Sequence, residues 1–443
     1  MKTIIINGIV ITMNKEMDWY PEGYVILEGS KICQAGPMEE IRDRLPELKA
    51  EGSRIEDARR AIVMPGMVNT HCHLGMIPFR GLGDDCKDRL RVFLLPMEQK
   101  AMDEEMAKLS SQYAICELLL AGVTTVFDMY YFEHAVAAAM DELGIRGIAG
   151  QTVMEEGACD FREVKDAVCY GEALMKKYQN HPRVSACLAP HGTTTCSMET
   201  LKLVHEKNKQ YHAPFTLHTA EMDYEMRYLR ETYNCTPIEF LDRIGVLDEH
   251  TVAAHGIQMT EADIRLLKSR GASVAHCIAS NTKAAKGVAP VPQMLSHGVA
   301  VGLGTDGPAS GNTLDIFTQM RFCANFHKNE SRNRSAMPAK DIVAMATIGG
   351  AKALGLDAVT GSIEAGKEAD LVLAETDSPN MFPVYDPYSA LVYSANSSNV
   401  RDVYVAGKQL VKDKKLVYAD DYDIRRKLRE KMGRSSFGEM RFL

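Results

Sequence analysis

The chain has 443 residues, of which 46% are hydrophobic and 25% charged, and its formal net charge is −8 at pH 7. This length is too great for one ordinary domain and suits a full barrel with a smaller appended domain. The modest negative charge, without a dense Lys/Arg stripe, argues against a nucleic-acid partner, and no apolar stretch approaches the length of a membrane span. The eleven scattered cysteines form no CxxC pair, which favours reduced thiols and a cytoplasmic location.

Both ends of the chain have sequence patterns typical of strands and turns. The first 62 residues show strand patterns at 3–6, 9–13, 23–28 and 31–36, with a helical segment near 39–45. Strand patterns return near 371–373 and in a hairpin at 400–411, and the basic run 425–431 fits one face of a solvated C-terminal helix. Neither end has enough strands to be stable alone, so we predict one β-sandwich composed of residues 1–62 and 365–443.

The middle of the chain, residues 63–364, alternates apolar runs with amphipathic helical patterns such as 103–120 and 260–270. Eight apolar runs are candidate strands, at 62–69, 123–128, 145–152, 184–190, 215–218, 252–255, 273–276 and 299–304. Eight strand–helix units are typical of a (β/α)8 barrel. The predicted fold class is therefore α/β, a (β/α)8 TIM-type barrel with a composite β-sandwich domain from both chain ends.

Two histidines one residue apart, His71 and His73, end the first barrel run. Side chains alternate along a strand, so both histidines point the same way and can bind one metal ion. Three later runs end in His218, His255 and Asp306. In a barrel of this type the loops after the strands build the active site, so these five side chains are expected at one mouth. Three imidazoles and one carboxylate suit Zn²⁺ or Fe²⁺, with one position left for water.

A metal-activated water needs a base to take its proton, and a leaving group needs an acid. Glu221 lies three residues after His218 and is the predicted acid/base, with a solvated charge at a helix start as the alternative. His255 is a further ligand, a group aimed at the hydroxide, or a hydrogen-bonded core histidine. Asp306 binds metal and accepts the water proton, or caps a helix.

The other histidines differ in expected role. His191 ends the fourth barrel strand and is expected to contact substrate, whereas a structural role is preferred for His276 at the end of the seventh. The remaining histidines, which include His205 and His327, fall in helical or polar stretches and are expected at the surface.

Several short motifs, taken together, identify a family. They lie at 64–73 (MPGMVNTHCH), 80–82, 121–125, 218–221 (HTAE), 254–256, 280–283 (SNTK), 287–291 and 304–307 (GTDG). The set resembles the amidohydrolase superfamily, and within it the aminohydrolase branch, over essentially the whole chain. That branch contains the S-adenosylhomocysteine/methylthioadenosine deaminases, the guanine and cytosine deaminases, and the triazine chlorohydrolases.

The resemblance implies one metal ion, Glu221 as the proton shuttle to a ring nitrogen, and His255 as the group that orients hydroxide. Attack at an amine-bearing ring carbon then expels ammonia. Binuclear branches use a carboxylated lysine on the fourth strand, and residues 184–191 contain none, so a single metal is favoured. The implied metal ligands are His71, His73, His218 and Asp306.

The closest likeness within the branch is to adenosine-type deaminases. Glu98 looks like the glutamate that binds ribose hydroxyls, with an exposed helix-start carboxylate as the alternative, and His191 looks like the histidine that contacts the purine. Two departures fall where substrate is held: residues 87–94 lack the usual Trp-Leu pair, and Gly192-Thr193-Thr194 replaces Ser-Pro-Tyr.

The leading prediction is a metal-dependent deaminase of an adenosine derivative, namely S-adenosylhomocysteine, methylthioadenosine or adenosine. A triazine or pterin aminohydrolase or chlorohydrolase is the second hypothesis, and a non-catalytic scaffold with the same fold is a remote third. The expected partners are a small heterocyclic substrate and further copies of the chain, in a homodimer or homotetramer.

Overall fold

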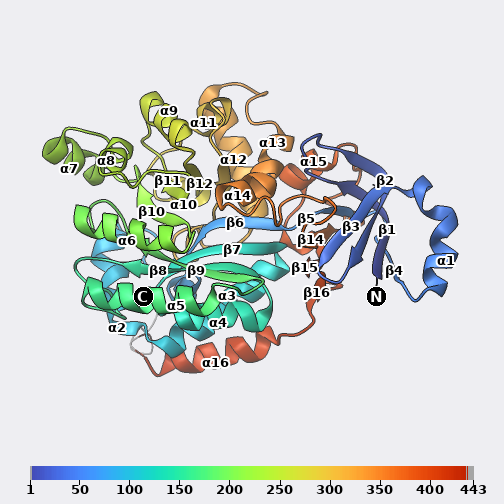
Figure 1. Ribbon diagram of the computed structural model, residues 1–443, viewed down its shortest axis with the longest axis horizontal. Helices are drawn as coiled ribbons and strands as arrows, with labels where there is room; N and C mark the ends of the chain where they lie inside the picture. The colour runs from blue at the N-terminus through green and yellow to red at the C-terminus, as the bar shows by residue number, and fades with distance from the viewer. Residues whose placement is uncertain (1, 436, 438–443) are drawn as a thin grey trace. The chain divides into compact units, whose positions relative to one another are not determined.

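The computed structural model describes residues 2–435 and 437 (Figure 1). Its chain divides into two compact units, each built from three segments. The first unit comprises Met1–Asn69, Leu118–Thr125 and Asp315–Tyr418, and the second comprises Thr70–Glu117, Val126–Leu314 and Ala419–Leu443. The domain boundaries expected at 62/63 and 364/365 stay a prediction.

The first unit contains a nine-stranded sheet to which both ends of the chain contribute. In spatial order its strands are β17 (Lys415–Leu416), β16 (Lys408–Lys412), β15 (Val400–Val405), β14 (Leu371–Ala374), β5 (Ile62–Pro65), β1 (Lys2–Ile11), β2 (Trp19–Glu28) and β3 (Lys31–Pro37), with β4 (Arg54–Asp57) beside β1. Val25 and Leu27 of β2 share one buried core with Leu371, Leu373 and Tyr404. The predicted composite β domain is therefore present.

Two details of this sheet differ from the predicted elements. The patterns at 3–6 and 9–13 belong to one strand, β1, whose pairing with β2 is irregular on both sides of Gly8. The apolar run 62–69 is divided between β5 in this sheet and β6 (Met67–Cys72) in the barrel. Gly66 lies between them: its amide N–H donates to the carbonyl of Asp370 at 2.8 Å, whereas the amide N–H of Met67 donates to the carbonyl of Gly122 at 3.1 Å.

The eight parallel barrel strands lie in two four-stranded sheets. One is β6, β7 (Val123–Tyr130), β8 (Arg146–Val153) and β9 (Val184–Pro190); the other is β10 (Phe215–Thr219), β11 (Thr251–His255), β12 (Ser273–His276) and β13 (Val301–Leu303). Single backbone hydrogen bonds join the ends of the two sheets. After β9, the amide N–H of His218 donates to the carbonyl of His191 at 3.1 Å. After β13, the amide N–H of Asp306 donates to the carbonyl of His71 at 3.0 Å. The predicted barrel fold is confirmed, although in the described residues the strand pairing does not run continuously around the barrel.

Helices connect these strands. Their bounds are α1 (Leu45–Ala50), α2 (Leu95–Ala101), α3 (Glu104–Leu120), α4 (Glu133–Leu143), α5 (Val164–Tyr178), α6 (Met198–Gln210), α7 (Asp223–Tyr233), α8 (Pro237–Arg243), α9 (Glu261–Arg270), α10 (Ile278–Lys283), α11 (Val291–Ser296), α12 (Ile316–Ser331), α13 (Ala339–Ala346), α14 (Ile348–Ala353), α15 (Pro387–Ser389) and α16 (Asp421–Gly433). Capping defines α9 closely: Thr260 and Asp263 form a capping box at its start, and Gly271 ends it at φ +74°.

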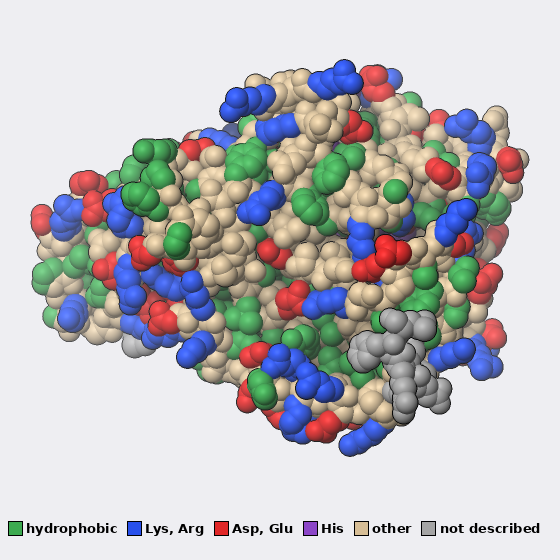
Figure 2. Space-filling view, turned by 180° about the vertical axis from the view of Figure 1, so that it is seen from behind, with side chains coloured by type: hydrophobic (Ala, Val, Ile, Leu, Met, Phe, Trp, Pro, Cys, Tyr) green, Lys and Arg blue, Asp and Glu red, His purple; other side chains and the backbone are tan. Residues whose placement is uncertain are grey.

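The C-terminal helix α16 is solvated, as predicted from its basic run. Leu428 is its buried residue, and Lys431 forms ion pairs with Asp103 at 2.6 Å and Glu105 at 2.8 Å. On the face of the molecule shown in Figure 2, acidic and basic side chains are interspersed and neither sign forms a continuous stripe. Among the helices of the described residues, none combines the length and apolar character needed to cross a membrane.

Two histidines expected at the surface are buried instead. His205 Nε2 lies 2.9 Å from Asp248 Oδ2, so a hydrogen bond to this carboxylate accommodates the buried imidazole. His327 is buried in α12. A polar residue on a helix gives no local signal that tertiary packing will cover it.

Candidate active site

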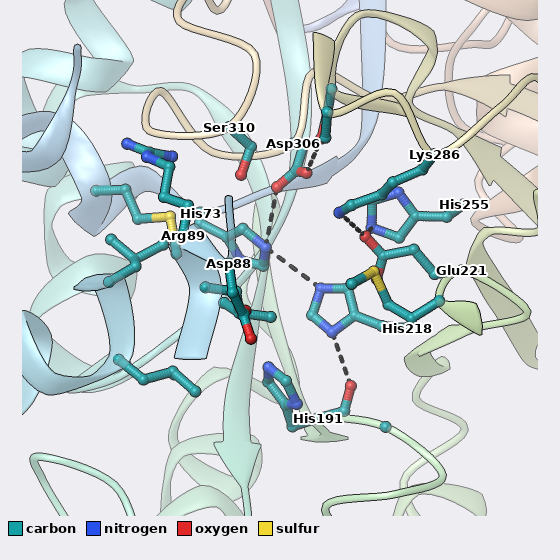
Figure 3. A pocket seen from close by; sticks show the side chains of 18 of the residues that line it. His73, Asp88, Arg89, His191, His218, Glu221, His255, Lys286, Asp306 and Ser310 are labelled. Atoms are coloured by element: carbon teal, nitrogen blue, oxygen red, sulfur yellow. Dashed lines mark hydrogen bonds and ion pairs between the residues drawn. The ribbon is translucent and has the colours of Figure 1, made fainter. Parts of the chain in front are cut away.

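A pocket lies in the second unit, at the carboxyl ends of the parallel strands (Figure 3). Loops after both four-stranded sheets contribute to its wall, as expected for a barrel of this type. Nearly all of the predicted site residues line it, namely His73, Glu98, His191, His218, Glu221, His255 and Asp306. The remaining one, His71, is buried close by, with its ring centroid 4.8 Å from that of His73.

Three histidine rings converge on one point. Ligand nitrogens of His71, His73 and His218 all lie within 4.8 Å of one another. His73 Nε2 lies 3.4 Å from His218 Nε2 and 3.2 Å from Asp306 Oδ1. His71 Nε2 is buried and has no hydrogen-bond partner among the described residues. Buried imidazole nitrogens directed at each other and at a carboxylate fit a divalent metal, which would take their lone pairs.

Hydrogen bonds outside this cluster orient its members. His73 Nδ1 lies 2.5 Å from the carbonyl of Met129, and His218 Nδ1 lies 2.7 Å from the carbonyl of His191. A carbonyl can only accept, so each Nδ1 carries a proton, and in the neutral ring each Nε2 presents a lone pair. Asp306 accepts from the amide N–H of Gly307 at 2.6 Å.

Two residues that line the pocket have unusual backbone conformations. His255 has φ +73° and Asp306 has φ +58°, both in the left-handed region that side chains rarely adopt. Each stands at or just after the end of a barrel strand. Such strain is typical of functional sites, where the surrounding structure fixes a side chain's direction.

Glu221 lies beside His255 in the same pocket. Its Oε1 is 3.7 Å from His255 Nε2 and 2.5 Å from Lys286 Nζ. Burial acts to raise the pKa of Glu221, but the nearby His255, Lys286 and His218 outweigh it and lower that pKa to about 2. The carboxylate is thus ionised at neutral pH and has lone pairs to accept a hydrogen bond or a proton.

Glu98 is buried rather than exposed, so the alternative of a solvated helix-start carboxylate is wrong. It lies in α2, and Tyr130 donates its hydroxyl to Glu98 Oε1 at 2.6 Å. Burial raises the pKa of Glu98 to about 7, against the lowering effects of Tyr130 and His73. Its Oε2 is buried without a hydrogen-bond partner in the described residues. An unsatisfied buried carboxylate oxygen on a pocket wall is available to a ligand hydroxyl.

His191 also lines the pocket, next to the histidine cluster. Its Nδ1 lies 3.0 Å from Thr195 Oγ1, and its ring centroid is 4.8 Å from that of His218. Burial lowers the pKa of His191 to about 4, so the ring is neutral at pH 7. A neutral imidazole can accept or donate a hydrogen bond to a heterocycle.

The segment 80–95 contacts residues that follow the strands β12 and β13. Arg89 begins a π-helical stretch, Arg89–Leu94, and donates to the carbonyl of Ala309 at 2.8 Å. Asp84 accepts from Lys283 and from Asn312, each at 2.8 Å. The sequence patterns predicted neither of these contacts.

Tyr130 and Lys286 are among the polar residues of the pocket that sequence reasoning missed. Tyr130 ends a barrel strand, and the same strand-end rule that selected the histidines could have selected it. Lys286 stands between the two motifs 280–283 and 287–291, which were recognised without a chemical role.

Comparison with known proteins places the chain in a family. The model of the amidohydrolase family matches residues 62–410. The chain belongs to the amidohydrolase family. This amidohydrolase is 34% identical over 416 residues to a 5-methylthioadenosine/S-adenosylhomocysteine deaminase of Syntrophobacter fumaroxidans, with 94% of each chain covered. It is 38% identical over 406 residues to a 5'-deoxyadenosine deaminase of Methanosphaera stadtmanae, covering 90% of this chain and 93% of the relative.

A solved structure supports the same placement. The amidohydrolase superposes on the crystal structure of an adenosine deaminase from Xanthomonas campestris with bound zinc, with a TM-score of 0.93 and 30% sequence identity over 98% of each chain. The family resemblance inferred from the motifs is therefore confirmed.

Proposed function

We propose that this amidohydrolase is a metal-dependent hydrolytic deaminase of adenosine derivatives. The substrate class comprises adenosine and its 5'-modified forms, including methylthioadenosine, 5'-deoxyadenosine and S-adenosylhomocysteine. The observation that carries the proposal is the joint presence of the histidine cluster and Glu221 in one pocket. Relatives covering nearly the whole chain are deaminases of such nucleosides, which supports the substrate class.

The metal would be held by His71, His73, His218 and Asp306, and Zn²⁺ is the ion we propose, with Fe²⁺ as the alternative. The donor set of three imidazoles and one carboxylate suits either ion. When bound, such an ion lowers the pKa of water from about 15.7 toward about 7 and so supplies hydroxide at neutral pH.

Glu221 and His255 would carry out the acid–base steps. Glu221 takes one proton from the attacking water and delivers it to the ring nitrogen next to the amine-bearing carbon. His255 orients the attacking hydroxide. The second water proton goes to the exocyclic amine, the C–N bond breaks, and ammonia leaves while the oxygen remains on the ring carbon as a carbonyl.

Glu98 and His191 would bind the substrate. The unpartnered Oε2 of Glu98 can accept from a ribose hydroxyl, while the ring of His191 lies next to His218 and can contact the purine. All eleven cysteines are free thiols, which supports our proposal of a cytoplasmic protein. A homodimer or homotetramer is the proposed assembly, and light scattering of the purified chain would test it.

Ammonia release by the zinc-loaded protein tests the proposed reaction. The panel contains adenosine, methylthioadenosine, 5'-deoxyadenosine, S-adenosylhomocysteine, guanine, cytosine, an aminopterin and an aminotriazine. We expect kcat/KM for at least one adenosine derivative to exceed that of every other compound by about 100-fold, a difference of about 2.7 kcal/mol in transition-state binding. Release from the other rings alone, or chloride release from a chlorotriazine, would contradict the proposal. An analogue lacking the 2' and 3' hydroxyls tests Glu98.

A further inference from the structure

One short segment orients several ionisable groups of the pocket. It runs from Ile278 to Lys286 and consists of α10 and the turn that follows. Ser280 Oγ donates to Asp306 Oδ2 at 2.5 Å. Asn281, the next residue, places its Oδ1 2.8 Å from His255 Nδ1. Two functional side chains therefore take their orientation from consecutive residues of this segment.

The end of the same segment contacts a third functional side chain. Lys286 Nζ lies 2.5 Å from Glu221 Oε1, and the two side chains are only 22% and 11% exposed. Water screens a pair buried to this degree much less than it screens an exposed ion pair. Figure 3 shows Lys286, Glu221 and His255 next to one another on one side of the pocket.

The contact leaves Glu221 with one occupied and one open oxygen. Oε1 is held by Lys286 and lies 3.7 Å from His255 Nε2. No hydrogen bond to Oε2 is found among the described residues. The backbone is held as well, because the amide N–H of Glu221 donates to Glu225 Oε2 at 3.1 Å. With both the backbone and Oε1 fixed, the remaining freedom of the carboxylate is small.

The neighbouring lysine of the segment serves another purpose. Lys283 Nζ lies 2.8 Å from Asp84 Oδ1 and 2.5 Å from Asn312 Oδ1. Lys283 therefore contacts the segment 80–95, whereas Lys286 is the lysine directed at Glu221.

We infer that Lys286 is a positioning residue for Glu221. Its ammonium group holds one carboxylate oxygen of Glu221, so that the other oxygen faces the water and the ring nitrogen between which the proton moves. The inference rests on the proposed function, because it requires Glu221 to be the proton carrier. Orientation of a catalytic group to within a fraction of an ångström is the contribution expected of such a contact.

Lys286→Met tests this role, since it keeps the unbranched apolar part of the side chain and removes the terminal ammonium group with its charge and donors. We expect kcat for ammonia release from the best nucleoside of the panel to fall about 10- to 100-fold, with KM and bound metal unchanged. Lys286→Arg retains a donor and should recover part of the loss. Lys286→Gln serves as a second neutral variant if Lys286→Met does not fold, and Lys268→Met, at an exposed lysine of α9, is the matched control.

A double-mutant cycle separates positioning from a general structural effect. In the Glu221→Gln background, Lys286→Met should lower kcat by no more than about twofold, because its effect passes through Glu221. An equal loss in both backgrounds, or wild-type kcat in Lys286→Met, would overturn the inference. Inactivity of the wild-type protein on every nucleoside would instead contradict the proposed function.

Discussion

Histidine tautomers determine what the pocket can bind at the scale of single residues. His73 and His218 each direct Nδ1 to a backbone carbonyl, and His255 directs Nδ1 to the amide oxygen of Asn281. Each of these oxygens accepts a hydrogen bond from Nδ1–H, so in the neutral form of all three rings the proton is on Nδ1 and Nε2 carries a lone pair. The pocket is thus lined with nitrogen lone pairs, which favours a cation over a further donor.

The role of Glu221 gives the first prediction. Glu221→Gln should lower kcat by about 10²- to 10⁴-fold, because an amide cannot accept and return a proton. Bound metal should stay at the wild-type level, because Glu221 is outside the proposed ligand set. Ammonia release and elemental analysis of the same preparation measure both quantities. Near-normal turnover would show that another group carries the proton.

Glu375 gives a prediction about stability and pH. Ser378 donates its amide and hydroxyl to this carboxylate, at 3.0 and 2.5 Å, and Asn399 Nδ2 donates at 2.9 Å. Burial acts to raise the pKa of Glu375, but these hydrogen bonds and Lys414 lower it to about 2. A depressed pKa in the folded state stabilises the fold above the unfolded-state pKa of about 4.3, and this contribution is lost as pH falls toward 2.

Glu375→Gln should therefore lower the unfolding temperature at pH 7, and the difference from wild type should shrink as pH falls from about 4.3 toward 2. Thermal unfolding of both proteins at pH 7, 4 and 3 measures it. A difference that is constant with pH would show that the charge of Glu375 contributes nothing.

At the scale of secondary-structure elements, the sequence predicted the positions of the metal-site candidates well. His71 lies in β6, His218 in β10 and His255 at the end of β11, and parallel pairing sets Thr219 opposite His255. Strand alternation and the common direction of barrel strands are local, repeated rules, so a single sequence was enough to bring these residues to one mouth.

Contacts between loops were beyond the same rules. Lys286 reaches Glu221 across 65 positions of the chain, and Asn281 reaches His255 across 26. In neither pair does the sequence around one residue indicate which distant residue it will contact. The division of the run 62–69 between two sheets was hidden for a similar reason, because it depends on partners far along the chain: Pro65 pairs with Leu371, whereas the amide N–H of Met67 donates to Gly122.

The close approach of two elements next to the cluster gives a third prediction. Gly75 lies in the 3₁₀ helix Leu74–Phe79, where a Cβ would collide with the ring of Tyr130. Gly75→Ala should destabilise the fold by about 1–3 kcal/mol and lower activity, since Tyr130 must shift from Glu98. Gly433→Ala, at the end of α16 where a Cβ meets open space, is the control and should not destabilise the fold. Equal unfolding free energies for both variants would contradict the close-packing argument.

At the scale of the whole molecule, every residue proposed for the chemistry belongs to the second unit, although each unit is assembled from three separate segments. The sheet of the first unit joins strands from both chain ends, since Leu371 of β14 pairs with Pro65 of β5. The sequence indicated that both chain ends contribute to one β domain, because neither end alone had enough strands for a stable sheet.

Removal and return of the metal tests metal-dependent deamination most directly. The protein is stripped of metal with a chelator, and Zn²⁺ is titrated back. At each step, ammonia release from the best adenosine derivative and the amount of bound metal are measured. We predict that stripping lowers turnover by at least about 100-fold and that activity returns in proportion to metal, saturating at about one ion per chain. Full turnover by the stripped protein, or saturation only at two ions per chain, would contradict the proposed mononuclear site.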